Sequence, residues 1–335
     1  MALSSDEIIK RELIDYLGAE IGNITARVFP EGSRDDQKAF EDGGLTFSFN
    51  NIKYGSCDLV YTQCENNEEI PVVAIEGTDC LNRGSSGNAQ YQRFHHALGA
   101  VKNGIIGIYY LKSGNLKIQA DLYAMAYHAS ILENGTYLIV QDLSVIKTIL
   151  ELLSKNNKKQ LDTFLNTCLE DGYEIFKEKF KDRYKSDWNR FANQRSTIIK
   201  DRYIIKHSAT SKRNIVDSGQ RKGHITLGEM FLSKYYFIDK TMYYLFPRMT
   251  KNDLEYINNH KKNDKEWSIL NKEPNVKLIT IDDISNVPDE IKNGLYSIRD
   301  TPLKGEDLIQ YKKYKKIIHD GLKNGDMQIR NLNQL

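Results

Sequence analysis

Two acidic residues, Asp58 and Glu76, lie in the stretch GSCDLVYTQCENNEEIPVVAIEGTD, which runs from Gly55 to Asp79. Asp58 opens one short apolar run and Glu76 closes the next, and the segment between them is long enough for a hairpin. Antiparallel pairing would therefore bring the two carboxylates together. Such a pair repels itself unless a hard cation lies between, and Mg²⁺ prefers oxygen ligands. The pattern indicates a magnesium site for phosphate chemistry, with solvated strand ends as the ordinary alternative.

The segments around this pair predict an α/β fold, a mixed central sheet flanked by helices. Phe94, Ala97, Leu98 and Val101 recur at helical spacing ahead of a glycine, which is typical of a helix with one buried face. Helices are expected over residues 1–18, 33–44, 85–104 and 143–153. Strands are expected within residues 45–63 and over 70–76, 104–111 and 136–142.

The order of these elements resembles the core of the PD-(D/E)XK nuclease superfamily, and most closely that of type II restriction endonucleases. The resemblance is carried by Asp58, a hairpin, Glu76-Gly77-Thr78, a polar helix and a further strand, over residues 33–140. It implies a restriction-endonuclease-like core in which Asp58 and Glu76 hold Mg²⁺. The expected chemistry is hydrolysis of a phosphodiester, with the cation lowering the pKa of a bound water.

The sequence departs from the family pattern at the catalytic lysine. Thr78 stands at that position, where the family usually has a lysine that helps to position the attacking water, although some restriction enzymes carry Glu or Gln there. With Thr78 in its place, a phosphate oxygen, a second metal or a nearby base such as Lys102 or His95 would orient the water. Glu41 matches the place where several family members supply a further acidic metal ligand, and an exposed helix acid is the alternative there.

The charge of the chain is divided unevenly, although its formal net value is only +2. Residues 1–150 hold 12 Lys and Arg against 19 Asp and Glu, a net −7, and the remainder holds 35 against 26, a net +9. This asymmetry suits a cation site beside a surface that binds a polyanion, and solvated lysine-rich helices are the plain alternative. We expect a nuclease core over residues 1–154 and a basic, α+β region for DNA binding and target recognition over residues 155–335.

The most basic stretch is residues 195–224, with eight Lys and Arg and two acids, and its many turn formers predict a mobile loop. Arg, Lys, Asn and Gln are the side chains suited to base edges and phosphates. Two further candidates, Gln92 and Arg93, lie on the polar helix. The expected DNA contacts are Gln92, Arg93, Lys212, Arg213, Gln220, Arg221, Lys222 and His224.

These features predict a cytoplasmic, Mg²⁺-dependent endonuclease of double-stranded DNA, a type II restriction enzyme that recognises a short sequence. A two-fold symmetric target would favour a homodimer. No apolar run is long enough for a membrane helix, and four cysteines without a CxxC pair argue against structural zinc and a disulfide framework. The alternatives are a non-catalytic DNA-binding protein and a non-specific metal-dependent nuclease of DNA or RNA.

Overall fold

The chain forms two units, Met1–Lys181 and Asp182–Leu335. A computed structural model describes residues 5–28, 46–50, 52–82, 90–91, 93–180, 196–199, 202–206, 235, 241–246, 248–260, 273, 276–289, 291–293, 296, 302, 308, 312, 316 and 318–325. Each unit contains its own β-sheet. Among the described residues, no helix combines the length and the apolar character that crossing a membrane requires.

A six-stranded sheet in the order β1-β2-β5-β6-β7-β8 is the centre of the first unit. Strands β2, β5 and β6 pair antiparallel, whereas β6, β7 and β8 pair in parallel, so the sheet is mixed as the sequence predicts. Its strands are β1 Glu20–Ile21, β2 Ile24–Val28, β5 Leu59–Glu65, β6 Glu68–Thr78, β7 Ile106–Leu111 and β8 Tyr137–Val140. A separate antiparallel pair is formed by β3 Thr46–Phe49 and β4 Ile52–Ser56.

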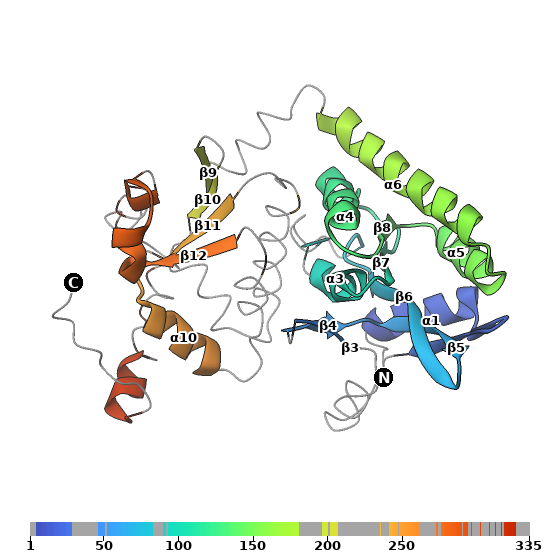
Figure 1. The fold of residues 1–335 in the computed structure, drawn as a ribbon, viewed down its shortest axis with the longest axis horizontal. Coiled ribbons are helices and arrows are strands. Elements are labelled where there is room, and N and C mark those ends of the chain that lie inside the picture. Colours follow the sequence, from blue (N-terminus) through green and yellow to red (C-terminus); the bar gives the residue numbers. More distant parts are fainter. Residues whose placement is uncertain are drawn as a thin grey trace. The chain divides into compact units, whose positions relative to one another are not determined.

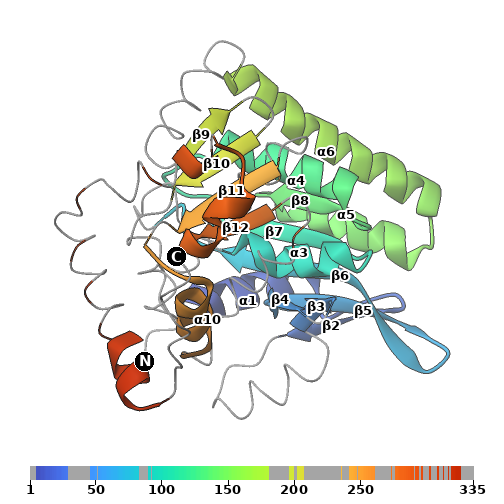
Figure 2. The ribbon, with the colours of Figure 1, turned by 60° about the vertical axis from the view of Figure 1, so that its left-hand side comes forward.

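Helices cover both faces of this sheet (Figures 1 and 2). One face packs Leu59, Ile75 and Ile108 against apolar residues of three of the helices. On the other face, the Phe94 ring stacks on Tyr137 at 4.3 Å between centroids. The first face is covered by α1 Ser5–Leu17, α5 Leu143–Ser154 and α6 Lys158–Phe180, and the second by α3 Phe94–Lys102 and α4 Ala120–Leu132. The α/β class with a mixed central sheet between helices is confirmed.

The boundary between the units lies later than the composition indicates. Lysine-rich sequence begins near residue 155, but α6 continues the first unit, because Leu161 and Leu165 are buried in its core and Tyr173 stacks on Tyr127 of α4. The contacts therefore divide the chain after Lys181 and not after residue 154.

The described part of the second unit contains a four-stranded sheet in the order β12-β11-β10-β9. Its strands are β9 Ser196–Ile199, β10 Arg202–Lys206, β11 Thr241–Phe246 and β12 Val276–Thr280, with the helix α10 Lys251–His260 and the 3-10 helix η3 Ile281–Asn286. The pair β9–β10 is antiparallel and the pairs β10–β11 and β11–β12 are parallel, which repeats the strand directions of β5 to β8.

The expectation of a loop across residues 195–224 is wrong at its start, where β9 and β10 form. The physical reason is local, because STII and RYIIK are rich in β-branched and aromatic residues, which favour paired strands. Residues 207–234 lie outside the described part of the chain.

Candidate functional site

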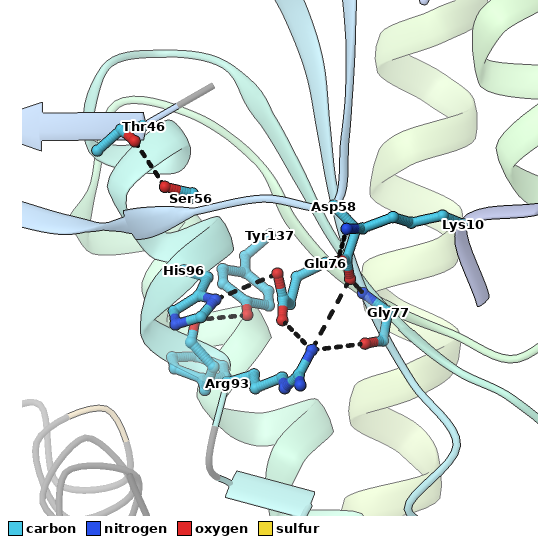
Figure 3. Close-up of polar contacts among 10 residues, drawn as sticks. Lys10, Thr46, Ser56, Asp58, Glu76, Gly77, Arg93, His96 and Tyr137 are labelled. Carbon is cyan, nitrogen blue, oxygen red and sulfur yellow. Dashed lines mark hydrogen bonds and ion pairs between the residues drawn. The ribbon is translucent and has the colours of Figure 1, made fainter. Parts of the chain in front are cut away.

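The hairpin of β5 and β6 brings the two carboxylates together as the sequence predicts (Figure 3). Asp58 directly precedes β5, and the antiparallel register pairs Leu59 with Ile75, so that Asp58 comes beside Glu76. On its other side β6 pairs in parallel with β7, which places Glu76 opposite Tyr109. The carboxylates therefore lie where the antiparallel and parallel halves of the sheet meet.

Both carboxylates are buried, with Asp58 7% and Glu76 1% exposed. One oxygen of Asp58, Oδ2, accepts a hydrogen bond of 2.9 Å from the backbone N–H of Gly77. Burial and the charge of Glu76 raise the pKa of Asp58 to about 8, although Arg93, the Gly77 N–H and Lys10 act in the opposite direction. The alternative of solvated strand ends does not describe this pair, because both carboxyl groups are buried among charged partners.

Three basic side chains surround the pair (Figure 3). The Nη1 atom of Arg93 lies 3.0 Å from Oε1 of Glu76 and 4.0 Å from Oδ2 of Asp58. Nδ1 of His96 lies 3.2 Å from the other Glu76 oxygen, Oε2, and Nζ of Lys10 lies 4.0 Å from the other Asp58 oxygen, Oδ1. Each carboxylate thus has an outer oxygen that faces Lys10 or His96 and an inner oxygen that faces Arg93.

Two glycines leave room for Lys10 and His96 to approach the carboxylates. A Cβ on Gly77 would lie 2.3 Å from Cγ2 of Ile9, the neighbour of Lys10 in α1, so any side chain there would push α1 away from the sheet. A Cβ on Gly55 would lie 2.5 Å from Cδ2 of His96. Glycine at position 77 therefore lets Ile9 approach β6 closely, which brings its neighbour Lys10 beside Asp58.

Thr78 has a local structural role. Its half-buried hydroxyl oxygen lies 3.2 Å from the backbone N–H of Cys80, which donates to it, and this bond closes the turn after β6. Lys102, proposed as a base, instead donates a hydrogen bond of 2.8 Å to Glu133. His95 is buried, with its ring edge-on to His96, so His96 and not His95 faces Glu76.

Arg93 is the predicted DNA contact that the structure places in the site, where it faces the carboxylates. Glu41 and Gln92 lie outside the described residues, so the structure gives them no position. The same holds for the expected DNA contacts of the second unit, Lys212, Arg213, Gln220, Arg221, Lys222 and His224.

Sequence reasoning missed Lys10 and assigned His96 no role. Lys10 belongs to the first helix, three residues before Leu13 and seven before Leu17, which are both buried in the core. A lysine on the apolar stripe of an amphipathic helix is a signal that it needs a buried anionic partner. That signal does not identify Asp58 as the partner, because the contact joins residues far apart in the sequence.

The donor atoms of the site fit a hard cation. Within the described ranges, no three His, Cys, Asp or Glu side chains gather into a ready-made metal site. Asp58 and Glu76 nevertheless supply carboxylate oxygens, and Mg²⁺ in phosphate chemistry is usually held by one or two carboxylates together with water and substrate phosphate. These two residues are therefore the protein ligands that Mg²⁺ would use here.

Comparisons of the chain with profiles of known protein families, with curated proteins and with solved structures find no match in any of the three. The chemistry of Asp58, Glu76 and the basic residues around them is therefore the basis for assigning a function.

Proposed function

We propose that this chain is a Mg²⁺-dependent endonuclease of double-stranded DNA, with a core of the PD-(D/E)XK type in its first unit. The observation that supports this most is the buried pair Asp58 and Glu76, brought side by side at the ends of paired strands. Burying two like charges together is unfavourable unless a cation compensates them. Burial and the charge of Glu76 raise the pKa of Asp58 in the metal-free protein, and a cation held by both carboxylates would favour the ionised form.

In this proposal Asp58 and Glu76 hold the cation, which when bound would polarise the scissile phosphate and lower the pKa of a water. Lys10 supplies the ammonium group that the motif lacks at Thr78. Its Nζ already faces Asp58 and its side chain is only 10% exposed. A buried ammonium in that place can hydrogen-bond to a water or a phosphate oxygen at the site.

The substrate assignment rests on charge. The second unit lies within the part of the chain that carries a net positive charge, and β10 contains Arg202 and Lys206. Basic surfaces bind the DNA backbone by releasing counterions, and side chains at base edges add sequence preference. We propose a type II restriction activity, with the second unit for target recognition and a homodimer for a two-fold symmetric site.

One observation favours a second function, that of a non-catalytic DNA-binding protein. Arg93 already lies against both carboxylates, so the cluster resembles a buried ion-pair network that holds α3 on the sheet. Such networks can fix a structure without any chemistry. In that case the cluster would bind no divalent ion, and only DNA binding would remain.

Incubation of the full chain with supercoiled plasmid and linear phage DNA in Mg²⁺, and in EDTA as the control, tests the proposal. We expect Mg²⁺-dependent cleavage into discrete fragments, whose mapped ends would share one short sequence. A continuous smear would replace the restriction activity with a non-specific nuclease. Intact DNA at every Mg²⁺ and protein concentration, together with a mobility shift, would favour the non-catalytic alternative.

A further inference from the structure

The position of Arg93 has a consequence for how the site takes up a metal ion. Its Nη1 atom lies 3.0 Å from Oε1 of Glu76, 3.5 Å from the carbonyl oxygen of Gly77 and 4.0 Å from Oδ2 of Asp58 (Figure 3). Lys10 and His96 face the outer oxygens of the two carboxylates. Arg93 thus bridges the inner oxygen of each carboxylate, and the Gly77 N–H donates to the inner oxygen of Asp58.

Arg93 differs from the carboxylates in its access to solvent. Its side chain is 29% exposed, whereas that of Glu76 is 1% exposed. Its backbone is fixed ahead of α3, where its carbonyl oxygen accepts a hydrogen bond of 3.1 Å from the N–H of His96. The guanidinium can therefore turn outward while the backbone stays in place. It cannot leave by losing its proton, because arginine remains charged in proteins.

We propose that Arg93 is a displaceable counter-ion, which occupies the space between Asp58 and Glu76 in the metal-free protein and competes with a divalent cation for their inner oxygens. This inference rests on the proposed metal centre. A guanidinium that has turned outward would lie at the solvent-exposed side of the site, where a DNA phosphate offers it a bidentate partner. Arg93 would then limit metal binding in the free protein and contact phosphate in the complex.

Binding of Mn²⁺ to the full chain without DNA, followed by electron paramagnetic resonance, tests this competition. Removing the competitor in Arg93→Gln is expected to tighten Mn²⁺ binding by about tenfold or more, within the usual range of coupling between two ligands. The matched control is Arg27→Gln, which removes an exposed arginine of β2 that pairs with Glu69, at the opposite end of β6 from Glu76. This control should bind Mn²⁺ with unchanged affinity.

Thermal unfolding gives a second readout that separates competition from a purely structural contact. Arg93→Gln should lower the Tm in EDTA, because buried Glu76 loses a charged partner. Mn²⁺ should then raise the Tm of this variant by more than it raises the Tm of the natural protein. Arg93→Lys retains a positive charge without the planar fork and should show intermediate Mn²⁺ affinity. A Tm that falls in Arg93→Gln and does not recover in Mn²⁺ would overturn the inference.

The outcomes also distinguish this inference from the proposed function. If the natural protein binds Mn²⁺ through a site that Asp58→Asn removes, and Arg93→Gln binds it no more tightly, the metal centre stands and the role of Arg93 is wrong. If neither the natural protein nor Arg93→Gln binds Mn²⁺, both the metal centre and the competition are excluded.

Discussion

Replacing Glu76 with Gln is expected to reduce Mg²⁺-dependent DNA cleavage by at least about a hundredfold, because changes to the mere partners of metal ligands already cost about 10- to 100-fold. Glutamine keeps the shape of the side chain and a carbonyl oxygen for Arg93 but removes the negative charge that would hold the cation. Binding to DNA in Ca²⁺, which supports binding without turnover in this proposal, should change little. Initial rates on plasmid DNA and a gel-shift titration measure the two quantities.

Glu133→Gln is the matched control for this experiment. It makes the same chemical change and breaks a hydrogen-bonded ion pair with buried Lys102, which lies outside the carboxylate cluster. It should reduce stability while leaving the cleavage rate of the folded protein within a few fold of the natural one. Near-normal cleavage by Glu76→Gln would remove the proposed site.

The second large effect is expected in the stability of the metal-free protein. The pKa of Asp58 is raised from its ordinary value of 3.8 to about 8, by burial and then by the charge of Glu76. The folded state therefore favours the protonated carboxyl of Asp58. The stability that this preference contributes is complete below the ordinary pKa of 3.8 and is lost as the pH rises from there through about 8. The free energy of unfolding should fall by up to about 1.4 kcal/mol for each pH unit across this window.

Asp58→Asn removes this ionisation and keeps an oxygen that accepts the bond from the Gly77 N–H. In EDTA the variant should be more stable than the natural protein at pH 8, and the difference should shrink toward pH 4, where Asp58 is protonated in both the folded and the unfolded protein. Urea unfolding at one-unit pH steps measures the difference. The charged groups facing Asp58 in the described structure are Glu76, Arg93 and Lys10, and all three are retained in the variant.

Asp142→Asn serves as the control for this pH series. Asp142 caps α5, and a hydrogen bond from the N–H of Ser144 lowers its pKa, so its effect should be constant between pH 5 and pH 8. An Asp58→Asn variant that is less stable than the natural protein at pH 8 would mean that the basic neighbours compensate Asp58 fully. The carboxylates would then already be neutralised by their own basic neighbours, and a metal ion would gain less by binding to them.

The sheet around the site was predictable because its signals are local. Alternating and buried apolar runs indicated the strands. Asp58, before the first run, and Glu76, at the end of the second, indicated how the strands of the β5–β6 hairpin pair. The helix expected over residues 143–153 is α5, Leu143–Ser154, whose N-cap Asp142 and apolar spacing both appear in the sequence. In the second unit, β11 and β12 likewise coincide with apolar runs that the sequence shows, TMYYLF and VKLIT.

Helix α4 was missed for a physical reason. Its sequence, ADLYAMAYHASIL, is apolar on most sides, so it lacks the polar face that reveals an amphipathic helix. The helix is packed between β8 and α6, where Tyr127 stacks on Tyr173. The expected helix over residues 85–104 has the right type, but α3 begins only at Phe94, so Arg93 comes just before its first turn and can face Glu76.

The basic residues around the carboxylates could not be predicted from the sequence. Lys10, for example, reaches Asp58 from a helix, and it lies 48 positions earlier in the chain. No local pattern encodes that approach, which depends on Gly77 lying beneath Ile9. The same limit applies to Arg93, whose type suggested a DNA phosphate and whose position places it on a carboxylate.

An anomalous difference map from crystals of the full chain grown in Mn²⁺ tests whether Asp58 and Glu76 hold a metal ion. We predict a manganese peak between Asp58 and Glu76, in contact with the inner oxygen of each, with the Arg93 side chain turned away from the position that it has in Figure 3. A map in which Arg93 still lies between the two carboxylates, with manganese absent from them at saturating concentration, would contradict it.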